Sequence, residues 1–293
     1  MPPTTWTILN LIRWADERFQ QKGLSTPRLD AEILLAEALG VDRVFLYTHF
    51  DQPLQTAELG RFKDYILRRL RREPLAYIVG KKEFWSLSLR VTPDVLIPRP
   101  ETEMLVDESL RVLSPSGKRD VRFQILEIGT GSGAISVALA KELPSAVFVA
   151  TDISAKAISV AEENAQQNGV QERIHFLQGD LFDPVEDRTS FDLIVTNPPY
   201  IPCGQLPSLM PEVRDFEPRA ALDGGENGLQ FYRRAWPRVG RYLLSGGWFL
   251  GEFGSGQGEG IRRIAAENPD LGSLAFVKDL AGMERVFKTR KEM

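Results

Sequence analysis

The four residues Asn197-Pro198-Pro199-Tyr200 directly follow an apolar run from Phe191 to Thr196. Such a run next to prolines is typical of a buried strand, so the turn is expected at the carboxyl end of that strand. The prolines have carbonyls that accept hydrogen bonds but no N–H to donate, and Asn197 adds a side-chain carbonyl. Tyr200 adds the flat face of its aromatic ring beside these acceptors. We therefore expect this turn to hold an NH2 group, with Asn197 and the Pro198 carbonyl accepting its two N–H bonds.

A glycine-rich turn follows the predicted strand from Phe123 to Gly129. Its residues are Gly129, Thr130, Gly131, Ser132 and Gly133. Glycines at such a point let the backbone turn tightly and let a ligand approach closely, although a plain strand-to-helix connection is an alternative. Asp152 lies about twenty residues further on, at the end of the second predicted strand, where an acid can accept hydrogen bonds from ribose hydroxyls. This arrangement suits either NAD or S-adenosylmethionine.

Three features favour S-adenosylmethionine over NAD: the Gly-x-Gly-x-Gly spacing, the pair Asp180 and Phe182 after the third strand, and an antiparallel last strand. We expect an adenine ring against Phe182, with Asp180 accepting a hydrogen bond from its amino group. The alternatives are that Phe182 is an ordinary core residue, that Asp180 caps a turn, and that Asp152 caps the next helix.

From Phe123 onward, predicted strands alternate with predicted helices, which indicates an α/β fold with a mostly parallel, doubly wound sheet. The predicted strands are 123–129, 147–153, 174–180, 191–196, 247–253, 274–280 and 284–289. The predicted helices are 133–142, 154–168, 226–244 and 256–267. The last two predicted strands are joined only by Ala281-Gly282. This connection is too short for a parallel crossover, so the last strand should be antiparallel.

The first 80 residues have apolar residues at helical spacing, which predicts a small helical domain. Its helix from Gln55 to Arg72 ends in four arginines, which suits either a solvated helix end or a surface for an acidic or RNA-bearing partner. Between Glu83 and Arg99 the period changes to two, with Thr92-Pro93-Asp94 as the turn of a predicted hairpin. We expect a helical domain at 1–80, a β-hairpin linker at 81–99 and a catalytic domain at 100–293.

The composition excludes several classes of protein. The 293 residues carry 36 Lys and Arg against 40 Asp and Glu, so general binding to nucleic acid through phosphates is not expected. A single cysteine, Cys203, and only two histidines leave no disulfide framework and no zinc-ligand cluster, so no metal site is predicted and a reducing cytoplasm is favoured. We find no membrane helix or secretion signal.

The motifs together resemble those of class I S-adenosylmethionine-dependent methyltransferases that act on a planar nitrogen. Four further segments narrow the resemblance to the HemK/PrmC family, over essentially the whole chain. These segments are Pro74-Leu75-Ala76-Tyr77-Ile78-Val79-Gly80, Glu83-Phe84, Val95-Leu96-Ile97-Pro98-Arg99-Pro100-Glu101-Thr102-Glu103 and Glu217-Pro218-Arg219-Ala220-Ala221-Leu222. The family methylates the side-chain amide nitrogen, N5, of the glutamine in the Gly-Gly-Gln motif of class I peptide chain release factors.

The resemblance implies a role for each matching position. Gly129 to Gly133 would surround the methionine part of the donor, and Asp152 and Phe182 would contact its ribose and adenine. Asn197 would be both next to the donor and part of the substrate site, which Pro198, Pro199 and Tyr200 complete.

Arg99 and Glu101 would shape the entrance of the pocket, although these two residues also suit a helix start. The family further implies a cytoplasmic enzyme that acts in translation termination, with recognition of the substrate partly through the helical domain.

The alternative is a methyltransferase for adenine N6 or another nucleobase amine, because such an amine is also a planar NH2. Such an enzyme needs a basic groove, whereas residues 76–293 carry 25 basic against 30 acidic residues. A scaffold protein without catalysis is a further alternative. No general base is evident from the sequence.

Overall fold

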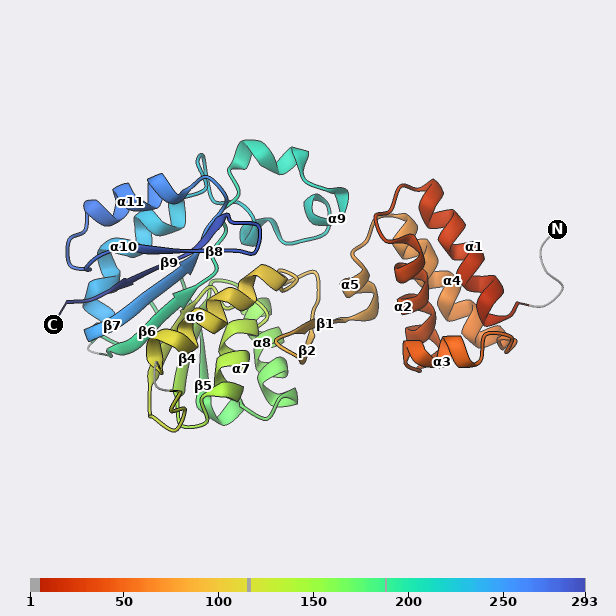
Figure 1. Cartoon of the computed structure of the whole chain (residues 1–293), viewed down its shortest axis with the longest axis horizontal. Helices are drawn as coiled ribbons and strands as arrows, with labels where there is room; N and C mark the ends of the chain where they lie inside the picture. The colour runs from red at the N-terminus through yellow and green to blue at the C-terminus, as the bar shows by residue number, and fades with distance from the viewer. Residues whose placement is uncertain (1–5, 115–116, 188, 293) are drawn as a thin grey trace. The chain divides into compact units, whose positions relative to one another are not determined.

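The computed structural model describes residues 6–114, 117–187 and 189–292. Residues 1–5, at the start of the predicted helical domain, and residue 293, at the end of the predicted catalytic domain, lie outside these ranges. The chain divides into two compact units: one holds the residues up to Gly80 together with Pro211–Phe216, and the other holds 81–210 and 217–293. The short return segment Pro211–Phe216 was not anticipated from the sequence. The colours of Figure 1 show how far it lies along the chain from the other helices of its unit.

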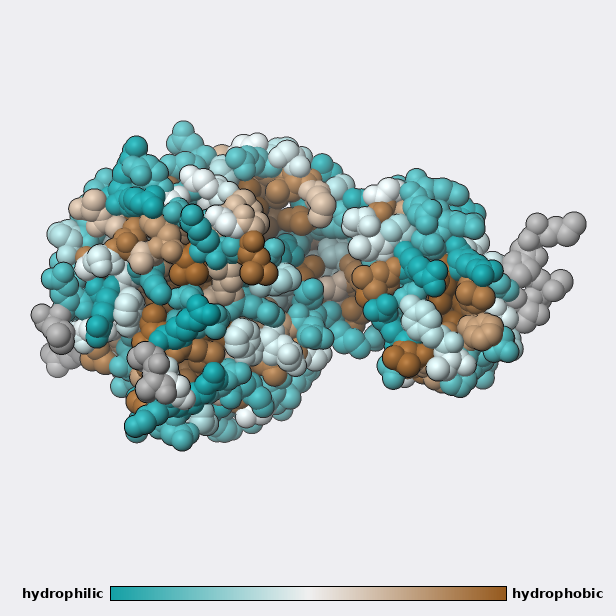
Figure 2. All heavy atoms as spheres, viewed as in Figure 1, coloured by the Kyte–Doolittle hydropathy of each residue, from teal (hydrophilic) through white to brown (hydrophobic). Residues whose placement is uncertain are grey.

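The first unit is helical. Its helices are α1 (Ile8–Gln21), α2 (Pro27–Leu39), α3 (Arg43–Thr48), α4 (Thr56–Leu70), α5 (Leu75–Val79) and the late α9 (Pro211–Arg214). Local chemistry sets their ends: the Asp42 side chain accepts from the Phe45 N–H at 2.8 Å to begin α3, and Gly40 ends α2 with a φ of 69°. Apolar side chains such as Phe19, Leu34 and Phe62 form its core. Figure 2 shows hydrophilic residues over much of its visible surface, with hydrophobic ones between them.

The arginines at the end of α4 are largely engaged inside the helical unit. The Arg69 guanidinium is buried and contacts Asp30 at 2.7 Å and Glu212 of α9 at 3.2 Å. Arg72 contacts the other oxygen of Glu212 at 2.9 Å, and Arg68 pairs with Glu73 at 2.5 Å. These arginines therefore bind acids of their own unit, and two of them bind Glu212 in the return segment. Their charges are paired, which disfavours a free basic surface at this helix end.

The second unit contains a seven-stranded sheet and a separate two-stranded hairpin. The strands are β1 (Lys81–Phe84), β2 (Leu87–Arg90), β3 (Gln124–Ile128), β4 (Val147–Asp152), β5 (Ile174–Gln178), β6 (Phe191–Thr196), β7 (Leu243–Glu252), β8 (Ala275–Lys278) and β9 (Glu284–Arg290). The large sheet has the order β5-β4-β3-β6-β7-β9-β8. Strands β3 to β7 are parallel, while β9 is antiparallel to both of its neighbours. The prediction of a doubly wound sheet with an antiparallel last strand is confirmed.

Helices cover both faces of this sheet, as Figure 1 shows. Helices α6 (Glu103–Leu113), α7 (Ala134–Glu142) and α8 (Ala155–Gln167) lie on one face, and α10 (Gln230–Tyr242) and α11 (Gly258–Ala266) lie on the other. Neighbouring strand residues alternate between the two cores: Leu193 packs into the first and Ile194 into the second. Both faces are therefore buried, which explains the apolar run Leu193 to Val195 in β6.

The hairpin differs from the prediction. Its turn is Trp85-Ser86, between Phe84 and Leu87, and not Thr92-Pro93-Asp94. Both turn residues have positive φ, 52° and 57°, which is the geometry of the two-residue turns that match the twist of paired strands. The run from Val95 to Ile97 forms no strand. Instead, the Ile97 N–H donates to the Glu217 carboxylate at 3.2 Å.

The starts of two other elements differ from the prediction. β7 begins at Leu243, four residues before the predicted strand, and α10 begins only at Gln230. Short 3-10 turns, η1 (Pro100–Thr102), η2 (Gln171–Arg173), η3 (Cys203–Ser208) and η4 (Arg219–Ala221), complete the elements. None of the helices in the described residues has the length and apolar character needed to cross a bilayer.

Candidate active site

Three chemically distinctive turns meet at one edge of the sheet. The glycine-rich turn follows β3, Asp152 ends β4, and Asn197 follows β6, and these three strands are adjacent in the order β4-β3-β6. Because they are parallel, their carboxyl ends lie at the same edge, where open α/β sheets bind ligands. A cavity of about 410 Å³ lies there, which is a size typical of small-molecule sites.

The glycine-rich turn lines this cavity with Gly129, Thr130, Gly131 and Ser132. Gly129 and Gly131 have φ values of 75° and 55°, which side chains rarely adopt, so the loop needs glycine there. Gly133 does not line the cavity among the described residues. A Cβ on Gly133 would lie 3.1 Å from the Cβ of Ala161, so this glycine serves the packing of α7 against α8.

A buried carboxylate lies beneath the loop. Glu127 accepts hydrogen bonds from the Thr130 hydroxyl at 2.7 Å and from the Ser136 N–H at 3.1 Å. Burial raises the pKa of Glu127 to about 7, against the lowering effect of these hydrogen bonds. The Glu127 side chain thus connects the loop to the first turn of α7.

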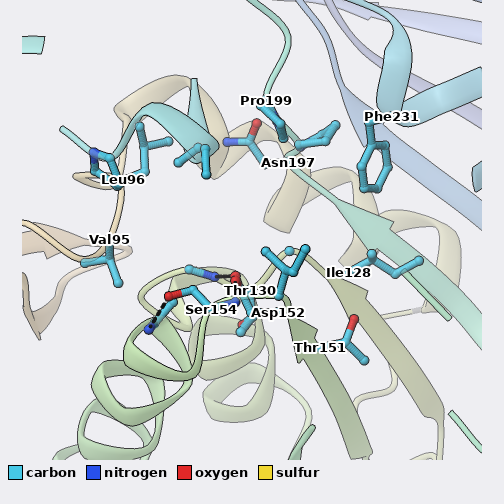
Figure 3. A pocket seen from close by; sticks show the side chains of 18 of the residues that line it. Val95, Leu96, Ile128, Thr130, Thr151, Asp152, Ser154, Asn197, Pro199 and Phe231 are labelled. Carbon is cyan, nitrogen blue, oxygen red and sulfur yellow. Dashed lines mark hydrogen bonds between the residues drawn. The ribbon is translucent and has the colours of Figure 1, made fainter. Parts of the chain in front are cut away.

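Asp152 also supports the loop. One of its carboxylate oxygens accepts from the Gly131 N–H and the other from the Ser154 N–H, both at 2.9 Å. Burial raises the pKa of Asp152, while these backbone donors lower it. Ser154, and not Asp152, caps α8, because its hydroxyl accepts from the Ala157 N–H at 3.3 Å. Asp152 still lines the cavity, and Figure 3 shows Asp152 and Ser154 across it from Asn197 and Pro199.

The structure places Phe182 away from the cavity wall. Phe182 is fully buried, stacks on Tyr242 with ring centroids 4.6 Å apart, and does not line the cavity among the described residues. The preceding Leu181 has a φ of 51° and lines the cavity instead. The aromatic ring beside the cavity is Phe231 of α10, which Figure 3 shows flanking it near Ile128. Asp180 does line the cavity, and Arg234 of α10 binds its carboxylate.

The acceptor turn contributes Asn197, Pro198 and Pro199 to the cavity. The Asn197 Nδ2 donates to the Thr102 hydroxyl at 2.9 Å, whereas its Oδ1 is buried and has no hydrogen-bond partner among the described residues. Leaving such an acceptor unpaired costs about 1 to 3 kcal/mol. The described structure thus holds an unpaired acceptor on a residue that lines the cavity.

Tyr200 lies behind this turn rather than in the cavity lining. Its hydroxyl donates to Glu252 Oε1 at 3.2 Å, and burial together with the nearby Glu252 charge raises the pKa of Tyr200. Glu252 is the last residue of β7, and its other oxygen accepts from the Thr102 hydroxyl at 2.7 Å. Burial raises the pKa of Glu252, and its hydrogen bonds lower it. Tyr200 is therefore held in place by the sheet.

The two residues expected at the pocket entrance differ in position. Arg99 lines the cavity, and its guanidinium contacts the buried Glu217 carboxylate at 2.6 Å. Glu101 is exposed and does not belong to the described lining of the cavity. The neighbouring Thr102 is buried and lines the cavity. Cys203 is exposed, and no cluster of three or more metal-ligating side chains occurs among the residues that the structure describes.

Sequence reasoning missed five residues that shape this site: Thr102, Glu127, Glu217, Phe231 and Glu252. Thr102 and Glu217 stand in segments that carry the family resemblance, and two of the others carry a signal of their own in the sequence. Glu127 and Glu252 are carboxylates within or directly after apolar strands, where a charge has to be paired or hydrogen-bonded. Phe231 has no such signal, because an aromatic residue on an amphipathic helix is most often core.

The strand order, the antiparallel β9 and a cavity between a glycine-rich loop, an acid and an acceptor turn define a class I methyltransferase. A family model described as the PrmC N-terminal domain matches residues 10–80, and one described as the methyltransferase small domain matches residues 103–206. The chain is 48% identical to the release factor glutamine methyltransferase of Geobacter sulfurreducens, over 88% of each chain. It is 40% identical to that of Rhodopirellula baltica, over 98% of this chain and 97% of that protein. The chain belongs to the release factor glutamine methyltransferase family.

Solved structures agree on the fold. A methyltransferase from Pyrococcus furiosus superposes with a TM-score of 0.54 at 18% sequence identity, covering 78% of this chain and 99% of that one. The family models and the curated relatives confirm the resemblance to the HemK/PrmC family and the predicted class of enzyme, an S-adenosylmethionine-dependent methyltransferase.

Proposed function

We propose that this enzyme transfers the methyl group of S-adenosylmethionine to the N5 amide nitrogen of the glutamine in the Gly-Gly-Gln motif of class I release factors. The sulfur–methyl bond breaks, a nitrogen–methyl bond forms, one amide proton is lost, and S-adenosylhomocysteine is the product. Family membership supports the substrate. The chemical argument rests on Asn197, which lines the cavity and whose Oδ1 has no hydrogen-bond partner among the described residues.

The donor side of the cavity fits S-adenosylmethionine. When bound, this cofactor supplies an electrophilic methyl group on a sulfonium. Gly129 to Ser132 would surround its methionine part, and the Asp152 carboxylate has lone pairs left to accept from ribose hydroxyls after its two backbone bonds. Asp180 would accept from the adenine amino group, and Phe231, rather than Phe182, would lie against the adenine ring.

The acceptor side would hold the glutamine amide. Its nitrogen is a poor nucleophile because its lone pair is delocalised into the carbonyl, so orientation has to supply part of the rate. Asn197 Oδ1 and the Pro198 carbonyl would accept the two N–H bonds and turn the face of the NH2 group toward the methyl group. Positioning of this kind contributes several kcal/mol, up to roughly 7 to 11 in ideal cases.

The same acceptors favour the transition state over the ground state. The nitrogen gains positive charge as the new bond forms, so its N–H groups become stronger donors to Asn197 Oδ1 and the Pro198 carbonyl. Pro199 and Tyr200 would exclude water from this side, and Arg99, held by Glu217, would lie at the entrance. The proton can leave to solvent after transfer, because the methylated amide nitrogen is acidic.

The proposal includes a cytoplasmic location and release factors as protein partners, without a direct nucleic-acid substrate. The negative net charge of −4 and the pairing of the α4 arginines with acids of their own unit support a protein substrate over a nucleobase.

The test is to incubate the enzyme with labelled S-adenosylmethionine and a class I release factor, and to locate the methyl group by peptide mass spectrometry. Label on the Gly-Gly-Gln glutamine is expected; label only on nucleic acid would overturn the proposal. Asn197→Ala should reduce turnover by about 100-fold or more, as loss of a transition-state hydrogen bond does, while calorimetry shows nearly unchanged donor affinity. Turnover like the wild type in this variant would refute the role given to Asn197.

A further inference from the structure

A hydrogen-bond chain with a fixed direction connects the sheet to the acceptor turn. Asn197 Nδ2 donates to Thr102 Oγ1 at 2.9 Å, and Thr102 Oγ1 donates to Glu252 Oε2 at 2.7 Å. Thr102 and Glu252 are 4% and 2% exposed, so water does not compete for these groups. The three residues come from β7, from the turn before α6 and from the loop after β6, and are far apart in the sequence.

The chemistry of the donors fixes the direction of this chain. Thr102 Oγ1 donates to Glu252 Oε2, and a threonine hydroxyl has a single hydrogen. Thr102 gives that hydrogen to Glu252, so it can only accept from Asn197. Only the NH2 end of the Asn197 amide can satisfy Thr102, and the carbonyl end is left without a hydrogen-bond partner among the described residues.

Glu252 is placed to act as the acceptor that sets this direction. Two hydroxyls donate to it, Thr102 to one oxygen and Tyr200 to the other, at 2.7 and 3.2 Å. Its own backbone carbonyl accepts from the Tyr232 hydroxyl, which fixes the end of β7. One carboxylate therefore anchors both ends of the Asn197 to Tyr200 turn.

We propose that Glu252 and Thr102 are positioning residues that select the catalytic orientation of the Asn197 amide, a proposal that rests on the function proposed above. In the reversed orientation, the NH2 of Asn197 would face the NH2 of the substrate, and two donors would meet. The correct orientation presents an acceptor. The hydrogen-bond chain from Asn197 through Thr102 to Glu252, here called the relay, maintains this orientation before the substrate arrives.

The discriminating variant is Glu252→Gln, which preserves size but offers one acceptor oxygen in place of two. A glutamine N–H that donates to Thr102 lets the threonine hydroxyl donate to Asn197 Oδ1, which reverses the amide. We expect the kcat to fall by about 10-fold or more. The donor dissociation constant measured by calorimetry should stay within about twofold, because the donor loop is not part of the relay.

Thr102 supplies a matched series that decides the question even if Glu252→Gln does not fold. Thr102→Val keeps the shape and removes the hydroxyl, so it should lower kcat about 10-fold, and Thr102→Ser should restore most of it. Thr289→Val is the control: Thr289 is equally buried in β9, donates to the Gly272 carbonyl at 3.0 Å, and should leave kcat unchanged.

The outcomes separate the two proposals. If the wild-type enzyme fails to methylate the release-factor glutamine, the proposed function fails. If it succeeds and Thr102→Val turns over like the wild type, or Thr102→Ser is as slow as Thr102→Val, the relay is wrong while the function stands. Equal losses of donor affinity and kcat in the folded Thr102 variants would also overturn the relay, because they would indicate a general structural role.

Discussion

The pH dependence of stability should reveal the buried carboxylate beneath the donor loop. Burial raises the pKa of Glu127 from 4.5 to about 7 in the folded enzyme, whereas the unfolded chain restores the ordinary value. Between these two pH values the folded state holds the proton and the unfolded state does not, so the free energy of unfolding falls as pH rises. One pKa unit corresponds to about 1.4 kcal/mol, so the free energy of unfolding should fall by about 3 kcal/mol in total. Most of this decrease should occur between pH 5 and pH 8.

Glu127→Gln removes the ionisation and keeps the shape. The difference in unfolding free energy, wild type minus variant, should therefore decrease by about 2 to 3 kcal/mol between pH 5 and pH 8, because other titrating groups cancel in the difference. Urea unfolding at several pH values measures it, and hydrogen exchange in β3 and α7 assigns the change to this unit. Exposed Glu162→Gln on α8 is the control and should give a curve parallel to the wild type. A parallel curve for Glu127→Gln would refute the reasoning.

Two further substitutions test the walls of the cavity. Phe231→Ala should weaken S-adenosylmethionine binding about 10-fold in calorimetry, because stacking of a base on an aromatic ring contributes about 1 to 3 kcal/mol. Phe182→Leu should lower stability with little effect on donor affinity, and the opposite pattern would restore Phe182 as the adenine contact. Gly228→Ala should lower kcat about 10-fold or more, because its Cβ would lie 2.1 Å from the Tyr200 carbonyl oxygen and displace the acceptor turn. Gly204→Ala points into open space, and an equal loss there would show that the steric argument is wrong.

The sequence alone was enough to determine the architecture of the sheet and its functional edge. Parallel strands separated by helices bring their carboxyl ends together, so the turns at Gly129, Asp152 and Asn197 had to meet once the alternation was recognised. The short connection around Ala281-Gly282 likewise fixed the antiparallel last strand, because no parallel crossover fits in so few residues. These conclusions follow from local spacing, and local spacing is directly visible in a sequence.

Tertiary packing decided what spacing cannot show. Phe182 and Phe231 are both aromatic and near the site in the fold, yet only the backbone at Leu181 and the packing of α10 determine which ring faces the cavity. Thr102 and Glu252 are 150 residues apart, and no local pattern predicts that their side chains meet behind Asn197. The acceptor turn was recognisable from its composition, but the direction in which its amide points depends on a hydrogen-bond chain that exists only in the folded protein.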